Sequence, residues 1–174
     1  MNKNVTLVLS IVLIFAGTLS RLLPHPLNFT PIAAIALFGG TYLNKKYSIV
    51  LPMLALLISD YLLGFYSGMI WIYGSFALIG LIGIWLKNNK SVPMIFGGTL
   101  LSSILFFAIT NFSVWIDGSL YPKTWDGLIA CYVAAIPFFR NTIAGDYFFV
   151  VVLFGSFELV NYFAKKYSVK IQSI

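Results

Sequence analysis

The chain has 174 residues, of which 60% are hydrophobic and only 9% are charged. A soluble domain has about a quarter of its residues charged, so these charges are too few to cover a water-facing surface. The composition excludes a soluble globular protein and predicts a single transmembrane domain over residues 1–174, with the lipid bilayer as its surroundings. The net charge of +6 comes from basic clusters between apolar runs, which is typical of topology signals and not of a nucleic-acid-binding surface.

The apolar runs are continuous, which favours helices over the short alternating strands of a membrane barrel. We therefore expect an all-α, polytopic membrane bundle with about six transmembrane helices and one shorter interfacial or re-entrant helix. In chain order the six spans cover Val5–Leu22, Thr30–Leu43, Ser48–Leu63, Met69–Leu86, Val92–Phe112 and Thr142–Phe163, and the shorter helix covers Gly127–Phe139.

A proline-rich hinge, Arg21–Pro31, joins the first two spans. Pro24 and Pro26 are expected to end the first helix, because proline lacks the backbone N–H and restricts the residue before it. Threonine is a good N-cap and proline is favoured at the first helical position. The second helix is therefore predicted to begin at Thr30, with Pro31 in its first turn.

The shorter helix, Gly127–Phe139, follows the longest polar connection of the chain, Ser113–Thr124. It is short for a membrane span, although a crossing stays open, and Pro137 is expected to end it. We interpret it as a separate helix that packs on the bundle near the membrane boundary.

Six spans would place both termini on one side of the membrane. That side would hold Lys3, Lys45, Lys46, Lys87, Lys90, Lys165, Lys166 and Lys170, and the other would hold Arg21, Lys123 and Arg140. Because positive charge stays in the cytoplasm, both termini are expected inside the inner (plasma) membrane. The hinge, the Gly64–Gly68 turn and the Ser113–Asn141 connection would then form an aromatic-rich outer mouth, which favours capture of a ligand.

Ten residues are candidates for ligand binding: His25, Asn28, Asp60, Phe65, Asn111, Trp115, Tyr121, Trp125, Arg140 and Asp146. Several of them also have a structural interpretation. Asp60 could form an ion pair with Arg21 that locks two helices together, because ionisable groups in apolar segments are usually paired. Asp146 could cap the last helix or pair with Arg140. His25 and Asn28 could stabilise the hinge, and the tryptophans could belong to an interfacial aromatic belt.

The scarcity of other reactive residues excludes several kinds of site. Cys131 is the only cysteine and His25 the only histidine, so an intrachain disulfide, a common zinc site and a bis-histidine haem are excluded. We expect no metal and no cofactor. The motifs H-E-x-x-H and G-x-S-x-G are absent, and Asp60 with Asp146 is a weak acid pair, so we do not expect an enzyme.

Three short motifs resemble a family of transport proteins. They are Asn28–Ala33 (NFTPIA), Ser59–Gly64 (SDYLLG), and Pro137-Phe138 followed by Gly145-Asp146. Together they resemble the substrate-binding S components of energy-coupling factor transporters. The hinge is also similar to an R-L-x-P-H-P-x-N-F-x-P-I pattern in an uncharacterised, S-component-like family of bacterial membrane proteins. The resemblance implies capture of a small organic solute or vitamin-like molecule at the outer face for uptake.

The same resemblance implies a transmembrane coupling subunit and ATPases as partners. The first helix, however, lacks the alanine-x-x-x-alanine pattern with which S components dock that subunit, so a protein that acts alone stays open. The alternative from another class is a structural or accessory subunit of a larger membrane complex, with no ligand of its own. Glycine-lined helices and short loops would suit such tight packing.

Overall fold

The computed structural model describes the backbone of residues 3–172, which is helical with no strand in that range. The prediction of an all-α fold is therefore confirmed. The helices are α1 (Lys3–Ser20), α2 (Ile32–Tyr42), α3 (Lys45–Ser48), α4 (Val50–Leu63), α5 (Met69–Leu86), α6 (Val92–Asp117) and α7 (Trp125–Gln172). The single turn α3 was not expected, because it lies in the predicted break between two apolar runs.

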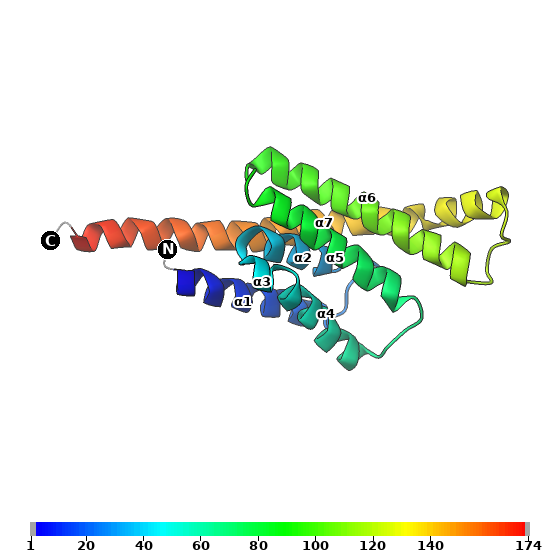
Figure 1. Ribbon diagram of the computed structural model, residues 1–174, viewed down its shortest axis with the longest axis horizontal. Helices are drawn as coiled ribbons and strands as arrows, with labels where there is room; N and C mark the ends of the chain where they lie inside the picture. Colours follow the sequence, from blue (N-terminus) through cyan, green and yellow to red (C-terminus); the bar gives the residue numbers. More distant parts are fainter. Residues whose placement is uncertain (1–2, 173–174) are drawn as a thin grey trace.

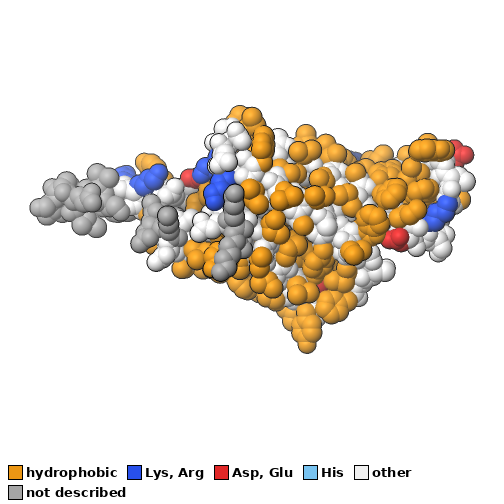
Figure 2. Space-filling model, in the orientation of Figure 1, with side chains coloured by type: hydrophobic (Ala, Val, Ile, Leu, Met, Phe, Trp, Pro, Cys, Tyr) orange, Lys and Arg blue, Asp and Glu red, His pale blue; other side chains and the backbone are white. Residues whose placement is uncertain are grey.

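Three helices are long and apolar enough to cross a membrane: Met69–Leu86, Val92–Asp117 and Trp125–Lys166. The helices α1, α2 and α4 contribute shorter apolar stretches. Apolar side chains cover most of the middle of the face in Figure 2, whereas the charged side chains gather toward its two ends. This distribution indicates that the protein is associated with a membrane.

Helix α2 lies at the centre of the bundle, and ten of its eleven residues are buried. Its closest neighbour is α5, against which it packs through glycines. A Cβ added to Gly40 would lie only 2.7 Å from the Cα of Gly83, so the two backbones touch. Thr41 adds a hydrogen bond from its hydroxyl to the carbonyl oxygen of Gly83 at 3.2 Å. Small residues thus allow α2 and α5 to approach closely, as in many membrane bundles.

The connections gather at the two ends of the bundle (Figure 1). The hinge after α1, the turn after α4 and the connection after α6 point toward one end. The segment around α3, the turn after α5, the beginning of α1 and the end of α7 lie toward the other. The side chains of Lys3, Lys45, Lys46 and Lys170 lie outside the described residues.

The segment Gly127–Phe139 is not the separate helix that the sequence led us to expect. It forms the first turns of α7, which continues without interruption from Trp125 to Gln172 with Pro137 inside it. A proline removes only one backbone hydrogen bond, whereas ending a helix in apolar surroundings would leave several groups unpaired. This part of α7 also packs on α6: the Tyr132 hydroxyl donates to the carbonyl oxygen of Ala108 at 2.6 Å.

Two predicted helix boundaries are also corrected. Helix α2 begins at Ile32 with Pro31 as its N-cap and no side-chain capping bond, so Thr30 does not cap it. Helix α6 extends to Asp117, which shortens the polar connection before α7. Thr30 does not cap a helix, and it lines a cavity.

Candidate functional site

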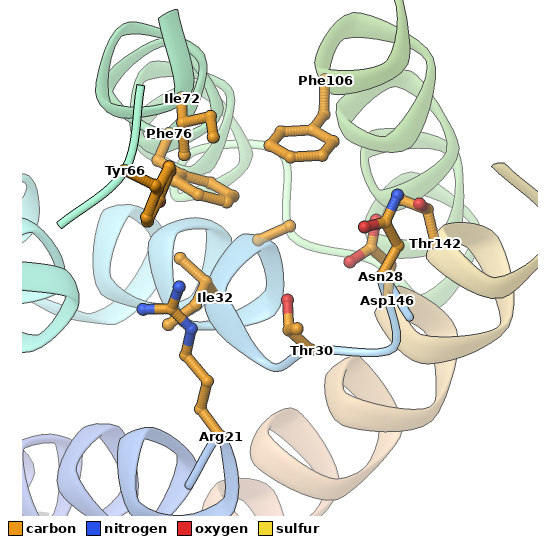
Figure 3. A pocket seen from close by; sticks show the side chains of 11 residues that line it. Arg21, Asn28, Thr30, Ile32, Tyr66, Ile72, Phe76, Phe106, Thr142 and Asp146 are labelled. Atoms are coloured by element: carbon orange, nitrogen blue, oxygen red, sulfur yellow. The ribbon is translucent and has the colours of Figure 1, made fainter. Parts of the chain in front are cut away.

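A cavity of about 220 Å³ lies beside the hinge, among α1, α2, α5, α6 and α7. Its walls combine polar side chains with aromatic and aliphatic ones (Figure 3). The lining residues are Arg21, Asn28, Thr30, Ile32, Ala33, Tyr66, Ile72, Phe76, Phe106, Thr142 and Asp146. An apolar pocket with a few convergent polar groups is the usual form of a small-molecule site.

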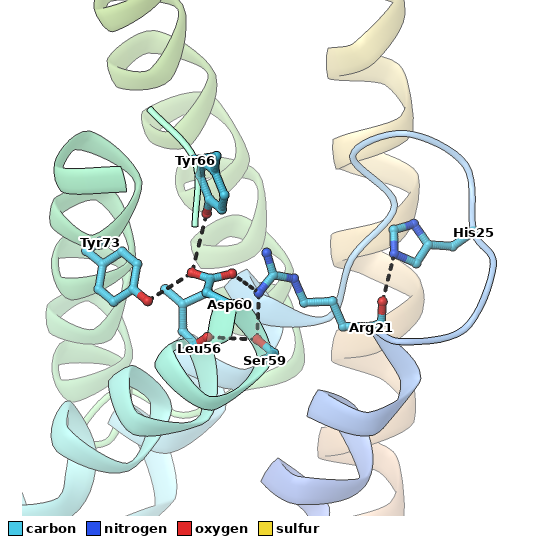
Figure 4. Close-up of polar contacts among 7 residues, drawn as sticks. All are labelled: Arg21, His25, Leu56, Ser59, Asp60, Tyr66 and Tyr73. Atoms are coloured by element: carbon cyan, nitrogen blue, oxygen red, sulfur yellow. Dashed lines mark hydrogen bonds and ion pairs between the residues drawn. The ribbon is translucent and has the colours of Figure 1, made fainter. Parts of the chain in front are cut away.

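Arg21 reaches the cavity from the end of α1 and forms an ion pair with Asp60 (Figure 4). Its Nη1 donates to Asp60 Oδ1 at 2.5 Å and to Ser59 Oγ at 2.6 Å. The Asp60 side chain is fully buried at the end of α4, whereas that of Arg21 is 13% exposed. The pair therefore ties α1 to α4 and presents the guanidinium to the cavity with its charge compensated.

Two tyrosines complete the shell around Asp60. Tyr73 of α5 donates to Oδ2 at 2.9 Å, and Tyr66 of the Gly64–Gly68 turn donates to the same atom at 3.4 Å. Partial burial, together with the charge of Asp60, raises the pKa of Tyr66 above its ordinary value. Its hydroxyl therefore stays protonated at neutral pH and remains a donor. The carboxylate is well satisfied, as a buried charge must be.

Asp146 is the second buried acid, and its surroundings differ from those of Asp60. It lies in α7 with 3% of its surface exposed, and the Ser103 hydroxyl of α6 donates to its Oδ2 at 2.6 Å. Within the described part of the chain, no basic side chain forms an ion pair with it. Asp146 thus lines the cavity with no ion-pair partner among the described residues.

The hinge is fixed against α7, which places Asn28 at the cavity. The backbone N–H of Phe29 donates to the Pro26 carbonyl at 3.0 Å, and Asn141 Nδ2 donates to the Leu27 carbonyl at 3.1 Å. Asn28 has φ of 62°, a left-handed conformation that asparagine tolerates better than most residues. The ring of Phe29 packs on α7, 5.7 Å from that of Phe148.

The apolar wall of the cavity is built around Phe76 and Phe106, whose rings stack at 5.1 Å with 22° between their planes. A second cavity of about 210 Å³ adjoins the first. The two share Asn28, Ile72, Phe106 and Thr142 as lining residues, so we regard them as two lobes of one cleft. The second lobe extends to Asn111, Phe138 and Phe139.

The ten candidate residues divide into two groups in the structure. Asn28 and Asp146 line the first lobe, and Asn28 and Asn111 line the second. Asp60 does not line either lobe, but it binds Arg21, which lines the first. The other candidates line neither lobe: His25, Phe65, Trp115, Tyr121, Trp125 and Arg140.

Several of these outlying residues have other contacts. His25 is exposed, with ring nitrogens near the carbonyl oxygens of Pro26 and Arg21 at 2.9 and 3.2 Å. Trp115 donates to the Pro122 carbonyl at 2.9 Å and so orders the α6–α7 connection. Phe65 and Trp125 are 63% and 81% exposed. These positions suit a loop or a membrane boundary better than a binding cavity.

The expected helix-capping role of Asp146 and its expected pairing with Arg140 are both wrong. Asp146 lies deep within α7, so it does not cap a helix, and its bond goes to Ser103 of α6. Glu158, farther along α7, accepts hydrogen bonds from Lys90 Nζ and the Tyr42 hydroxyl, each at 2.7 Å. Both acids of α7 thus bind residues from other parts of the bundle.

Sequence reasoning missed Thr30, Tyr66, Tyr73, Ser103 and Thr142. A usable signal was present for Ser103, because it lies in a run of small polar residues inside an apolar helix. Such residues commonly bond across membrane helices. For Tyr73 the sequence offered only its position near a boundary, where aromatic belts are expected anyway. Across residues 3–172, no group of three His, Cys, Asp or Glu side chains is placed to hold a metal ion.

Comparison with known proteins adds a family and no function. No curated protein and no solved structure matches the chain. One family model does match, over residues 1–169, which is nearly the whole length. The chain therefore belongs to the family of unknown function DUF6580.

Proposed function

We propose that this protein binds a small organic solute in the cleft beside the hinge and takes part in its uptake across the membrane. The observation that carries the proposal is the cleft itself, a partly polar cavity within an otherwise apolar bundle. Its two lobes together reach the range of about 300 to 1,000 Å³ that is typical of small-molecule sites. An ionisable residue that faces such a cavity is a candidate for a functional role, because its desolvation is costly.

In this proposal the chain crosses the inner (plasma) membrane six times, with both termini in the cytoplasm. The direction of the helices in Figure 1 supports this arrangement, because the hinge and the α6–α7 connection lie opposite the lysine-bearing turns. The cleft would then open toward the outer face. The resemblance to S components of energy-coupling factor transporters supports uptake. A coupling subunit and ATPases would be the partners if the protein is coupled.

The first experiment is mass spectrometry of small molecules that co-purify with the protein after gentle extraction from its membrane. We expect one enriched solute, which is lost in Asn28→Gly and kept in Trp115→Ala. Glycine adopts the positive φ of Asn28 without strain, so the variant removes the side chain and preserves the hinge. Trp115 lines neither lobe and is the matched control. A wild-type extract with no enriched solute would count against the proposal.

A second candidate function is that of an accessory subunit in a membrane complex. The observation in its favour is the C-terminal part of α7, which extends beyond the rest of the bundle (Figure 1). Apolar side chains in the C-terminal part of α7, such as Leu159 and Tyr162, are 57% and 60% exposed. Cross-linking in native membranes followed by purification would then yield a stoichiometric partner on this helix. If such a partner is found while no solute co-purifies, the accessory function is the better proposal.

A further inference from the structure

The two charged side chains that line the cavity are compensated to different degrees. Arg21 is paired with Asp60, and this aspartate also accepts hydrogen bonds from Tyr66 and Tyr73. Asp146 has a single neutral donor, Ser103, and no cation among the described residues. Among the described residues, Asp146 is therefore the less compensated of the two buried acids beside the cavity.

A carboxylate in apolar surroundings is stable only when it is paired or well hydrogen-bonded. The single hydroxyl donor of Asp146 stabilises a carboxylate less than the arginine and two tyrosines that surround Asp60. A cation inside the cavity would compensate the carboxylate of Asp146 directly. On this basis we propose that the solute carries a protonated amine that binds the carboxylate of Asp146, an inference that rests on the proposed function of the cleft.

The groups around Asp146 fit an ammonium group. Asn28, Thr142 and Asp146 gather on one side of the cavity, and Arg21 lies across from them (Figure 3). An ammonium has three donors and no acceptor, so it can bond the carboxylate and use the side-chain oxygens of Asn28 and Thr142 for the rest. The guanidinium on the far side donates to an acceptor at the other end of the solute.

The middle of the cavity defines the body of the solute. The stacked rings of Phe76 and Phe106, together with Ile72, form an apolar wall between the two polar ends. A cavity of about 150 Å³ holds benzene, so the first lobe, at about 220 Å³, has room for a ring with a short amine chain. The proposed solute class is thus a small organic amine with an apolar or aromatic body.

The test uses three probes of nearly equal size that differ in charge: phenethylamine, 2-phenylethanol and phenylacetate. Binding to the full chain in lipid nanodiscs is measured by calorimetry at pH 7. We expect the amine to bind about tenfold or more tightly than the alcohol, because hydrogen bonds to charged groups are the stronger ones. Phenylacetate is expected to bind weakest, because it places a second anion near Asp146.

Variants then locate the charge effect. Asp146→Asn keeps an oxygen for the Ser103 donor but removes the charge, and it should reduce the preference for the amine to near unity. Asp126→Asn changes an exposed acid in the first turn of the same helix, outside the cavity, and should leave the preference intact. If Asp146→Asn fails to fold, the order of the three probes on the wild-type protein and on Ser103→Ala decides the question.

Each outcome bears on the inference. Equal binding of amine and alcohol, or an unchanged preference in Asp146→Asn, would overturn the amine while leaving solute binding in place. Failure of all three probes to bind would overturn the proposed solute class. The proposed function would then still be judged separately, by the co-purified solute and its loss in Asn28→Gly.

Discussion

Arg21 and Asp60 are 39 residues apart in sequence, yet they form an ion pair of 2.5 Å that joins the end of α1 to the end of α4. Arg21 and Tyr66, which both bind Asp60, also line the cavity. Stability and site geometry therefore depend on the same ion pair.

We predict that removing one member of this pair is costly. Arg21→Met should lower the free energy of unfolding by about 3 to 5 kcal/mol, because it leaves a buried carboxylate without its cation. The double variant Arg21→Met/Asp60→Leu should be less destabilised than Arg21→Met alone. Unfolding in mixed detergent micelles measures both. An additive double variant would mean that the two side chains do not interact energetically.

The pair between Lys90 and Glu158 provides the matched control. Its N–O distance is 2.7 Å, but the two side chains are 38% and 46% exposed. Lys90→Met should change the stability by no more than about 1 kcal/mol, because exposed ion pairs contribute little. A larger loss there would show that the two pairs do not differ in the way their burial indicates.

The contact between α2 and α5 should tolerate no added methyl group. We expect Gly83→Ala to destabilise the fold by about 1 to 3 kcal/mol or more, since the new Cβ would overlap the carbonyl oxygen of Leu37. Gly74→Ala on the same helix is the control, because nothing lies within 4 Å of its Cβ position. It should stay within about 1 kcal/mol of the wild type. Thermal unfolding in nanodiscs compares the two, and equal effects would contradict the close approach.

The continuity of α7 through Pro137 can be measured as a distance. Spin labels at Ile129 and Val151, both exposed, should be roughly 33 Å apart if the helix rises by about 1.5 Å per residue. The labels are attached to cysteines introduced at these two positions, and Cys131 is replaced by alanine so that it is not labelled as well. Pulsed electron resonance gives the distance. A value far below the expected one would indicate that the first turns fold back as a separate helix.

The proposed orientation in the membrane makes a prediction about labelling. Ser119→Cys, in the α6–α7 connection, should react with a membrane-impermeant maleimide added to intact cells. Asn89→Cys, in the turn between α5 and α6, should react only after the membrane is opened. The background of both is Cys131→Ala, although Cys131 itself is buried. Reaction of both cysteines from outside would contradict six crossings with cytoplasmic termini.

Sequence reasoning reached part of this fold and part of the site. The apolar runs indicated most helices, because lipid-facing helices are apolar along their whole length. Asn28, Asn111 and Asp146 were identifiable because polar residues in an apolar chain are rare. Pro137 was misread, because a rule for helices in water was applied where water cannot replace a lost backbone bond. Once α7 was cut at the wrong place, Asp146 was assigned to a helix end and to the wrong partner.

Other contacts could not be predicted from the sequence alone. Tyr73 and Ser103 act on residues of other helices, and no local pattern gives the rotation of one helix against another. His25, Trp115 and Trp125 were candidates because of their chemistry, but His25 lies in the hinge, the tryptophans lie at the ends of α6 and α7, and none of them lines the cleft. Residue type suggested which side chains could bind a ligand, and packing decided which of them face the cavity.

The central position of α2 has a consequence for biogenesis. This helix is made early in translation, but its two main packing partners, α5 and α7, are made later. With ten of eleven residues buried, α2 has almost no surface left for lipid in the finished protein. Because synthesis proceeds from the N-terminus, α2 must be held in another environment until α7 is complete. The order of the helices along the chain therefore makes the assembly of the cleft one of the last events in folding.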